Sequence, residues 1–303
     1  MSDVIQRLAR KRLLIVTGKG GVGKSLVTAA LGLELSRAGR RVLLLETDPR
    51  ESLCHALDET PSGGGIVRTE SGLCFQNHRV RNVLDAFVRE RIGIKIIARK
   101  VIESAVYQHA VATAPGVSEL ALLGYAQSTV VGKRPTFDIV LIDAPATGHG
   151  LAMMRAPQLV ASAIERGPLR ALADRLALFQ ADPEGSGVVI VTTAEEMPVN
   201  ETLELIAALE KEFSRRPELL ITNGLYPAPT AEEADTSLIE LCRRRHEVNR
   251  HELARLCEAW PGPRIDLPLI PLETGLALTR ELARRLSAQR IFGKGSCREM
   301  PEA

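Results

Sequence analysis

The sequence predicts an α/β protein in which a mostly parallel sheet is flanked by helices. Short apolar runs alternate with longer helical patterns along the chain, and this order is typical of strand–helix–strand units. The apolar runs are continuous, which suits strands covered by helices on both faces. The chain has 303 residues, 45% of them hydrophobic, and can therefore bury one large core.

The predicted strands are 13–16, 41–46, 139–142, 188–191, 219–221 and, more weakly, 265–267. A helix is expected from about 24 to 38, because Gly39 follows it as a helix terminator. Residues 51–72 are rich in Gly, Ser and Pro and predict a mobile loop.

The stretch from about 82 to 131 is helical in pattern and contains no strand-like run. We interpret it as a small helical subdomain inserted between two strands; helices packed on a face of the sheet are the equal alternative. Residues 1–12 read as a polar, basic N-terminal arm and 293–303 as a flexible tail. A single domain is then expected over 13–292.

Bulk composition excludes several classes of protein. The formal net charge is only +2 and aromatic residues are 3%, so nucleic acid is not an expected partner. The N-terminus lacks the apolar segment of a secretory signal, and no apolar run is long enough to span a bilayer. Five cysteines without paired spacing favour reduced thiols. Together these features predict a soluble, cytoplasmic protein.

The strongest motif is the Walker A pattern Gly18-x-x-x-x-Gly23-Lys24-Ser25, with a predicted strand before it and a helix after it. Its glycines let backbone N–H groups turn toward phosphate oxygens, and the helix N-terminus adds its dipole. Lys24 is expected to reach the β- and γ-phosphates, and the Ser25 hydroxyl to be a ligand of Mg²⁺. The sequence therefore predicts a Mg·ATP site.

Two aspartates follow apolar strands. Asp48, after the strand 41–46, can orient or deprotonate an attacking water, although an Asp-Pro turn is the alternative. Asp143 ends the strand 139–142 in a Walker B pattern, and its carboxylate is expected to bind Mg²⁺ through water. Lys19, directly after the first loop glycine, is either a solvated side chain or a cation that reaches a facing subunit's nucleotide.

The loop GKGGVGKS with its extra lysine resembles the deviant Walker A branch of P-loop ATPases. The segment DAPATGHG at 143–150 resembles switch II of the ArsA/Get family within that branch, and the whole pattern is most similar to the bacterial single-domain ArsA-like ATPases. The resemblance covers residues 13 to about 290 and implies a P-loop NTPase fold, ATP hydrolysis and a dimer that sandwiches ATP, with Lys19 crossing the interface.

The resemblance also implies roles for individual residues. Asp48 corresponds to the switch I aspartate that orients the lytic water. In switch II the corresponding residues are Asp143, Pro145, Thr147, Gly148 and His149. The implied nucleotide-binding residues are Gly18, Lys19, Gly20, Gly21, Val22, Gly23, Lys24, Ser25, Leu26, Glu195, Asn223, Pro268, Pro271 and Leu272. Among these, Glu195 matches an interface glutamate, Asn223 a residue that binds adenine, and the last three the loop that closes over the base.

The sequence departs from the family in places that bear on its cargo. The family continuation TDPAHNLSD reads TDPRESL here, so the His and Asn are missing. Cys242 has no second cysteine in Cys-x-x-Cys spacing, and with His246 it makes only two candidate ligands, so no structural zinc is expected. The five methionines form no long cluster, and the cysteines form no close set for a metalloid.

Three roles therefore remain open. The first is an ATP-driven switch that acts on a protein or anion-transport partner, either as a homodimer or as a heterodimer with a paralogous ArsA-like ATPase; a membrane protein or transporter could be that partner. The second is the catalytic subunit of an arsenite or anion efflux pump. The third is a MinD-like membrane positioning ATPase whose helix near 274–290, with Leu276, Leu282, Leu286 and several arginines, would bind lipid.

Overall fold

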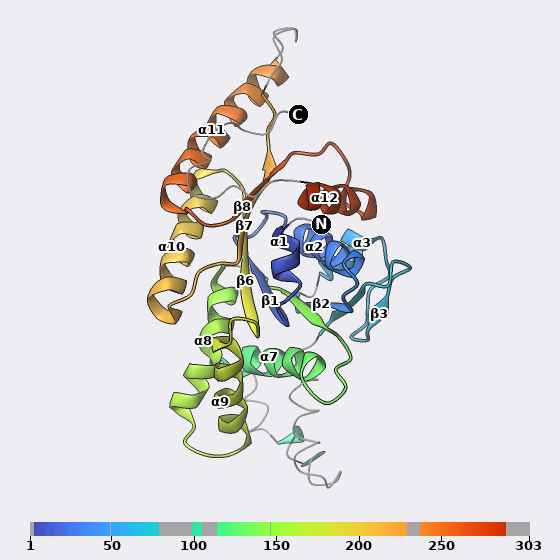
Figure 1. The fold of residues 1–303 in the computed structure, drawn as a ribbon, viewed down its shortest axis with the longest axis vertical. Helices are drawn as coiled ribbons and strands as arrows, with labels where there is room; N and C mark the ends of the chain where they lie inside the picture. The colour runs from blue at the N-terminus through green and yellow to red at the C-terminus, as the bar shows by residue number, and fades with distance from the viewer. Residues whose placement is uncertain are drawn as a thin grey trace.

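The computed structural model describes residues 3–48, 50–78, 99–100, 102–104, 114–145, 147–228 and 237–288. They form an α/β fold around an eight-stranded sheet with the order β3-β4-β2-β5-β1-β6-β7-β8 (Figure 1). All neighbouring strands are parallel except the pair β3–β4. The predicted fold class is thus confirmed. The strands are β1 Leu13–Thr17, β2 Val42–Glu46, β3 Val67–Arg68, β4 Cys74–Asn77, β5 Ile139–Asp143, β6 Ser186–Thr192, β7 Leu219–Leu225 and β8 Arg264–Pro268.

Helices cover both faces of the sheet, which explains the continuous apolar runs. Successive strand residues point to opposite faces, so Leu14 and Val16 of β1 join one hydrophobic cluster, and Leu13 and Ile15 join another. The first cluster includes α1, α2, α3 and α12; the second includes α7, α8, α9 and α10 (Figure 1). The helices are α1 Asp3–Leu8, α2 Lys24–Arg37, α3 Ser52–Leu57, α7 Val117–Val130, α8 Thr147–Ala163, α9 Pro168–Ala181, α10 Glu196–Phe213, α11 Ser237–Ala259 and α12 Leu276–Ala288.

The strand order decides which loops meet. β1 lies between β5 and β6, and β5 lies between β1 and β2. In the parallel register Val16 and Glu46 both pair with Asp143, so β1, β2 and β5 end side by side. The loops that follow these strands therefore converge at one edge of the sheet, where open α/β sheets place their ligands.

The N-terminal segment differs from the predicted arm. Residues 3–8 form α1, whose Val4, Ile5 and Leu8 are fully buried in the core. Their spacing places them on one face of a short helix, while Arg7, Arg10 and Arg12 are exposed. Lys11 is also fixed, because its Nζ lies 2.6 Å from Glu218 Oε1 and 2.5 Å from the Pro183 carbonyl oxygen.

The predicted mobile loop 51–72 contains regular structure as well. It forms α3 and β3, and β3 pairs with β4 as a short antiparallel extension of the sheet. Gly72 has a φ of 81°, and the turn is closed by the Thr69 N–H, which donates to the Leu73 carbonyl over 2.9 Å. Strands of two and four residues carry too little periodicity to be recognised in the sequence.

Much of the predicted subdomain 82–131 lies outside the described residues, as does the predicted tail 293–303. Within it, α7 packs against α8 and α9, and its Leu120 and Leu123 are buried in the second cluster. This part therefore matches the alternative of helices packed on the sheet. Among the described residues, Cys54, Cys74 and Cys242 are free thiols.

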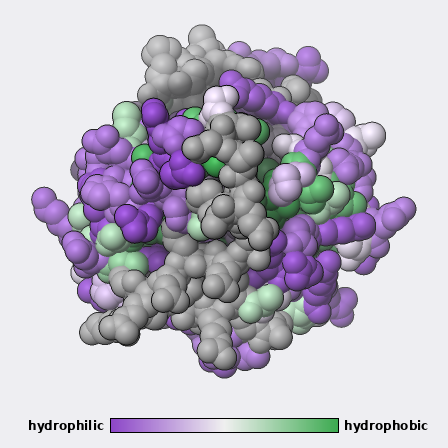
Figure 2. All heavy atoms as spheres, turned by 90° about the horizontal axis from the view of Figure 1, so that it is seen from above, coloured by the Kyte–Doolittle hydropathy of each residue, from purple (hydrophilic) through white to green (hydrophobic). Residues whose placement is uncertain are grey.

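On the face drawn in Figure 2, hydrophilic residues dominate and hydrophobic residues occur in small, separate groups. No helix among the described residues combines the length and the apolar character that a bilayer crossing requires.

The burial of α1 predicts that Ile5→Ala lowers the free energy of unfolding by about 2–4 kcal/mol, because the truncation leaves a cavity in the core. Gln6→Ala is the matched control on the exposed side of the same helix and should change stability by less than about 0.5 kcal/mol. Urea denaturation measures both. Equal midpoints for the wild type and Ile5→Ala would show that the segment is the free arm that the sequence suggested.

Candidate functional site

The loop between β1 and α2 has the backbone conformation that its glycines predict. Gly23 caps α2 with a φ of 87°, in the left-handed region. Gly18 packs so tightly against β6 that a Cβ there would lie 1.9 Å from the Val191 carbonyl oxygen. Gly20 and Gly21 face open space, where an added Cβ would meet nothing within 4 Å. The loop thus presents bare backbone to a cavity at the N-terminus of α2, a suitable site for an anion.

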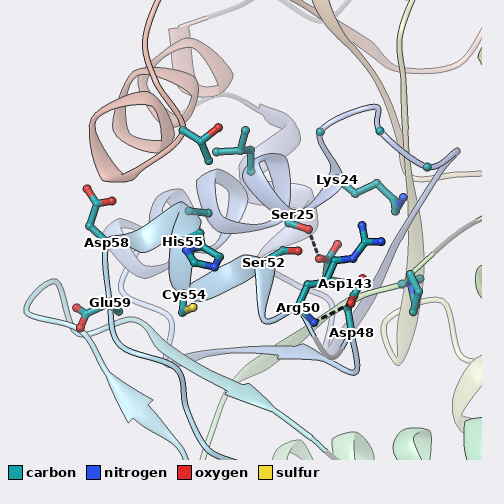
Figure 3. Close-up of a pocket in the computed structure, with 18 residues that line it drawn as sticks. Lys24, Ser25, Asp48, Arg50, Ser52, Cys54, His55, Asp58, Glu59 and Asp143 are labelled. Carbon is teal, nitrogen blue, oxygen red and sulfur yellow. Dashed lines mark hydrogen bonds between the residues drawn. The ribbon is translucent and has the colours of Figure 1, made fainter.

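Lys24 and Ser25 begin α2 and point into this cavity (Figure 3). The Lys24 ammonium donates to the Lys19 carbonyl oxygen over 2.8 Å. The Ser25 hydroxyl donates to Asp143 Oδ2 over 2.6 Å, so the Walker A serine and the Walker B aspartate are in direct contact. Burial lowers the pKa of the Lys24 ammonium, and the carboxylates of Asp143, Asp48 and Glu201 oppose this. A buried cation of this kind favours an incoming anion.

Asp143, at the end of β5, is the buried carboxylate of the site. Burial raises its pKa to about 6, while hydrogen bonds from Ser25 and Thr28 and the charge of Lys24 lower it. Thr28 lies one helical turn after Lys24 and donates to Asp143 Oδ1 over 3.2 Å. Both carboxylate oxygens of Asp143 therefore face hydroxyl groups of α2.

Asp48 follows β2 and reaches the same cavity from the other side. Its Oδ1 accepts the backbone N–H of Arg50 over 2.9 Å, and its carbonyl oxygen accepts Asn77 Nδ2 over 2.6 Å. These two bonds hold the backbone around the aspartate while Oδ2 makes no hydrogen bond to the described residues. Asp48 can therefore orient a water without losing its support.

The cavity has a volume of about 740 Å³, within the range of small-molecule sites. It extends from the phosphate loop along α3 to the start of α12. Its lining residues are Gly20, Gly21, Gly23, Lys24, Ser25, Leu26, Asp48, Arg50, Ser52, Cys54, His55, Ala56, Asp58, Glu59, Asp143, Ala144, Pro145 and Thr274.

Lys19 does not line the cavity. Its ammonium forms an ion pair with Glu201 of α10 in the same chain, and both side chains remain partly exposed. Glu195 is similarly outside the cavity: it caps α10 and lies 3.1 Å from the Arg245 guanidinium on α11. Lys19 thus extends from the phosphate loop toward α10, and Glu195 lies between α10 and α11.

The predicted base pocket is only partly assembled around the cavity. Asn223 Nδ2 donates to the Val22 carbonyl oxygen over 2.9 Å and so supports the phosphate loop. Pro268 ends β8, whereas Pro271 and Leu272 line a separate depression of about 650 Å³ with Arg37, at the opposite end of α2. In this structure Thr274 is the residue of that closing loop that reaches the cavity.

Switch II, defined here as residues 143–150, leads from Asp143 into α8, which begins at Thr147. Pro145 lines the main cavity and also a second one of about 400 Å³, where it meets His149 and Asp48. Gly148 faces open space. Gly150 is packed so closely that a Cβ would lie 2.3 Å from Thr17 Oγ1, which places the start of α8 directly against β1.

Sequence reasoning missed Glu46, the last residue of β2. The residue is 1% exposed, and its carboxyl group accepts the Leu53 N–H at 3.2–3.3 Å. Burial raises its pKa to about 8, and the Leu53 hydrogen bond opposes this only in part. A glutamate that ends an apolar strand was the available signal. Thr28, four residues after Lys24, and Arg50 in the cavity wall were missed too.

The oxygen atoms at the start of α2 suit a hard divalent cation. The Ser25 hydroxyl and the Asp143 carboxylate lie 2.6 Å apart, and Mg²⁺ prefers such oxygen ligands, usually with several waters. The donor set therefore fits the predicted ion. At the candidate zinc position, His246 Nδ1 lies 2.9 Å from the Tyr226 carbonyl oxygen. Within the described ranges no three His, Cys, Asp or Glu residues gather as a metal site.

Comparison with known proteins places this site in a family. The profile of the anion-transporting ATPase family matches residues 11–169 and 168–288. ATPase BagA of Mycobacterium tuberculosis is 26% identical over 326 residues, which cover 94% of this chain and 95% of that protein. The arsenical pump-driving ATPases of Escherichia coli and Acidiphilium multivorum are 25% and 24% identical over 78% and 81% of this chain, which spans 43% and 44% of their lengths.

The buried glutamate predicts a specific pH dependence. Because the folded-state pKa of Glu46 is about 8, above the ordinary 4.5, the folded protein holds a proton there that the unfolded chain releases. This contribution to the free energy of unfolding is complete below pH 4.5 and is lost as the pH rises toward 8. Glu46→Gln keeps an acceptor for Leu53 but cannot ionise. At pH 8 it should be more stable than the wild type by at least about 1 kcal/mol, and at pH 5 by much less.

Urea denaturation at a series of pH values measures the difference between the two proteins, and Glu51→Gln provides a control for a neighbouring carboxylate. If the curves of wild type and Glu46→Gln run parallel from pH 5 to 8, Glu46 is ionised in the folded protein and the assignment is wrong.

Proposed function

Because the chain belongs to the anion-transporting ATPase family, the ArsA family, we propose that this ATPase is a dimeric molecular switch that binds Mg·ATP and acts on a protein or anion-transport partner in the cytoplasm. One observation carries the proposal: a single cavity brings together Lys24, Ser25, Asp48 and Asp143 from three separate segments of the chain. These are the groups that phosphoryl transfer to water requires.

Each group has a distinct part in hydrolysis. The loop N–H groups and Lys24 bind the β- and γ-phosphate oxygens. Ser25 would hold Mg²⁺ directly and Asp143 would hold it through water, and the bound ion would neutralise phosphate charge. Asp48, supported by Asn77 and the Arg50 N–H, orients the attacking water and accepts its proton.

The switch action is supported by the two cavities that share walls. Asp48 and Pro145 line both the phosphate cavity and the second cavity, whose far wall is formed by Ser118 and Leu122 of α7 and Met153 of α8. Loss of the γ-phosphate would release the loops that carry Asp48 and Pro145, as in other nucleotide switches. The same movement would then alter the surface formed by α7 and α8, where a partner could sense it.

A dimer is supported by the position of Lys19, which extends from the phosphate loop toward α10. In the isolated chain its charge is neutralised by Glu201. In the proposed dimer Lys19 leaves Glu201 and contacts the nucleotide of the facing subunit. The facing subunit is either a second copy or a paralogous ArsA-like chain.

A pump subunit is the second candidate, favoured by relatives that are named arsenical pump-driving ATPases. Those proteins are more than twice the length of the matched segment, so the likeness reaches only part of each. The MinD-like alternative required a lipid-binding face on α12. There Leu282, Ala283 and Leu286 are buried in the core cluster that includes α2, so this face offers the idea no support.

Asp48→Asn should bind ATP with nearly wild-type affinity but lower the turnover by about 100-fold or more, because the amide cannot take the proton of the water. Lys24→Ala is the matched variant that should lose nucleotide binding itself. Titration calorimetry and a phosphate-release assay separate the two effects. Wild-type turnover in Asp48→Asn would exclude Asp48 as the residue that activates water.

Lys19→Ala should fold normally and still bind ATP as a monomer, yet lose the ATP-induced dimer, because no cation crosses the interface. Gel filtration with and without ATP measures this. Mixing Lys19→Ala with Lys24→Ala adds a sharper test: if Lys19 acts in trans, the Lys24→Ala subunit supplies it and part of the hydrolysis returns. An unchanged dimer in Lys19→Ala together with no recovery in the mixture would rule the role out.

A further inference from the structure

Arg50 lies in the short loop between β2 and α3 and forms part of the phosphate cavity wall. Figure 3 shows its side chain extending into the same region of the cavity as Lys24 and Asp143. It follows Asp48 by two residues, so the two side chains are carried on the same backbone segment. A second cation thus enters the cavity beside the Walker A lysine.

The guanidinium of Arg50 is uncommitted within the described part of the chain, where no carboxylate lies within ion-pair distance of it. The neighbouring acids have other partners. Asp48 Oδ1 accepts the Arg50 backbone N–H, and Glu51 Oε2 accepts the Ser62 N–H over 2.8 Å. Many other arginines on the surface form ion pairs, for example Arg41 with Asp138 and Arg170 with Asp174. Arg50 therefore has a charge in the cavity and all its side-chain donors available.

The loop that carries Arg50 is anchored at both ends. The Glu51 N–H donates to the Asp48 carbonyl oxygen over 3.1 Å, and Asn77 Nδ2 binds the same oxygen over 2.6 Å. After the loop, the Leu53 N–H is held by the buried carboxyl group of Glu46. Such anchoring lowers the entropy lost when an exposed side chain takes up one position on a ligand.

Among the lysines of the phosphate loop, only Lys24 lines the cavity, so Arg50 adds a second positive charge there. Lys24 sits at the phosphate loop, while Lys19 is turned away toward Glu201. The γ-phosphate of ATP has three non-bridging oxygens, and each can accept more than one hydrogen bond, so acceptor positions remain beside those that the loop and Lys24 use. A planar guanidinium can bind two of them at once, which the single ammonium of a lysine cannot do.

We propose that Arg50 binds the terminal phosphate of ATP within its own subunit and stabilises the charge that develops there during hydrolysis. The inference rests on the proposed ATP site and adds a catalytic residue to it. The water oxygen forms a bond to the γ-phosphorus as the bond to the β–γ bridging oxygen breaks. One water proton passes to Asp48, and ADP and phosphate are released. Arg50 makes its hydrogen bonds to the γ-phosphate oxygens throughout this step.

The test compares Arg50→Ala and Arg50→Lys with Arg68→Ala, an exposed arginine of β3 that lies outside the cavity. In Arg50→Ala the turnover should fall by about 100-fold or more, within the range known for arginines that act on a transferred phosphoryl group. Its affinity for a non-hydrolysable ATP analogue should fall about tenfold, while its affinity for ADP stays within about twofold of wild type. Arg50→Lys should recover a small part of the lost turnover, because the charge returns without the fork, and Arg68→Ala should behave as wild type.

Subunit mixing distinguishes action within the subunit from action across the dimer. Lys24→Ala has an intact Arg50 but binds no nucleotide, so mixing it with Arg50→Ala should restore no activity. Recovery in this mixture would overturn action within the subunit.

Equal losses of ADP and ATP-analogue affinity, or wild-type turnover in Arg50→Ala, would overturn the contact with the terminal phosphate. If wild-type protein binds no nucleotide, the proposed function itself fails, and that result is separate from these outcomes.

Discussion

The buried carboxylate of Asp143 is the constraint on which the site depends. It ends the central strand β5, it is only 7% exposed, and its two oxygens face the hydroxyl groups of Ser25 and Thr28 on α2. Moving a carboxylate out of water is costly unless hydrogen bonds or cations compensate. The start of α2 must therefore lie against the end of β5, and the phosphate loop, which connects β1 to α2, is held beside them.

The register that pairs Glu46 with Asp143 adds a second buried acid next to the first. Glu46 stays protonated there, so the negative charge at this edge comes from Asp143 and Asp48, and the cations that it attracts are Lys24 and, we propose, Mg²⁺ and Arg50.

Local chemistry explains which parts of this arrangement were predictable. The loop glycines, Lys24 and Ser25 are determined by backbone geometry within a few residues, and the continuous apolar strands report burial on both faces, so the fold class was predicted correctly. Glu46 could not be interpreted in the same way. Its burial depends on β2 pairing with β5 and on α3 folding back to place the Leu53 N–H over it, and neither contact is encoded within the strand itself. The helix α1 was missed because its buried face is only three residues wide within a basic segment.

Contacts between residues far apart in the sequence also explain why the predicted base pocket is only partly assembled. The resemblance implied that Pro271 and Leu272 close over the nucleotide base, whereas in this structure they lie at the far end of α2 with Arg37. α12 is held by the Asp58 side chain, at the C-cap of α3, and by the Ala56 carbonyl oxygen of α3, which accept the Leu276 N–H and the Thr279 hydroxyl over 2.9 and 2.6 Å. The position of the loop before α12 is therefore linked to α3, and α3 in turn to Glu46. Arg50 belongs to the same group of contacts, because the loop that carries it begins at β2 and ends at α3.

These contacts connect the nucleotide site with two other parts of the molecule, α12 and the surface formed by α7 and α8. The Asp48 loop is joined to α3 through Glu46 and Leu53, and α3 is joined to α12 through Asp58. On the other side, Asp48 and Pro145 form walls of the second cavity against α7 and α8. A ligand shifts a conformational equilibrium only by the difference between its affinities for the two states. The γ-phosphate is the part of the nucleotide that Asp48, Arg50 and switch II would contact and that ADP lacks. Its presence is therefore the one difference that could move both α12 and the α7–α8 surface, and a partner that binds either surface would sense which nucleotide is bound.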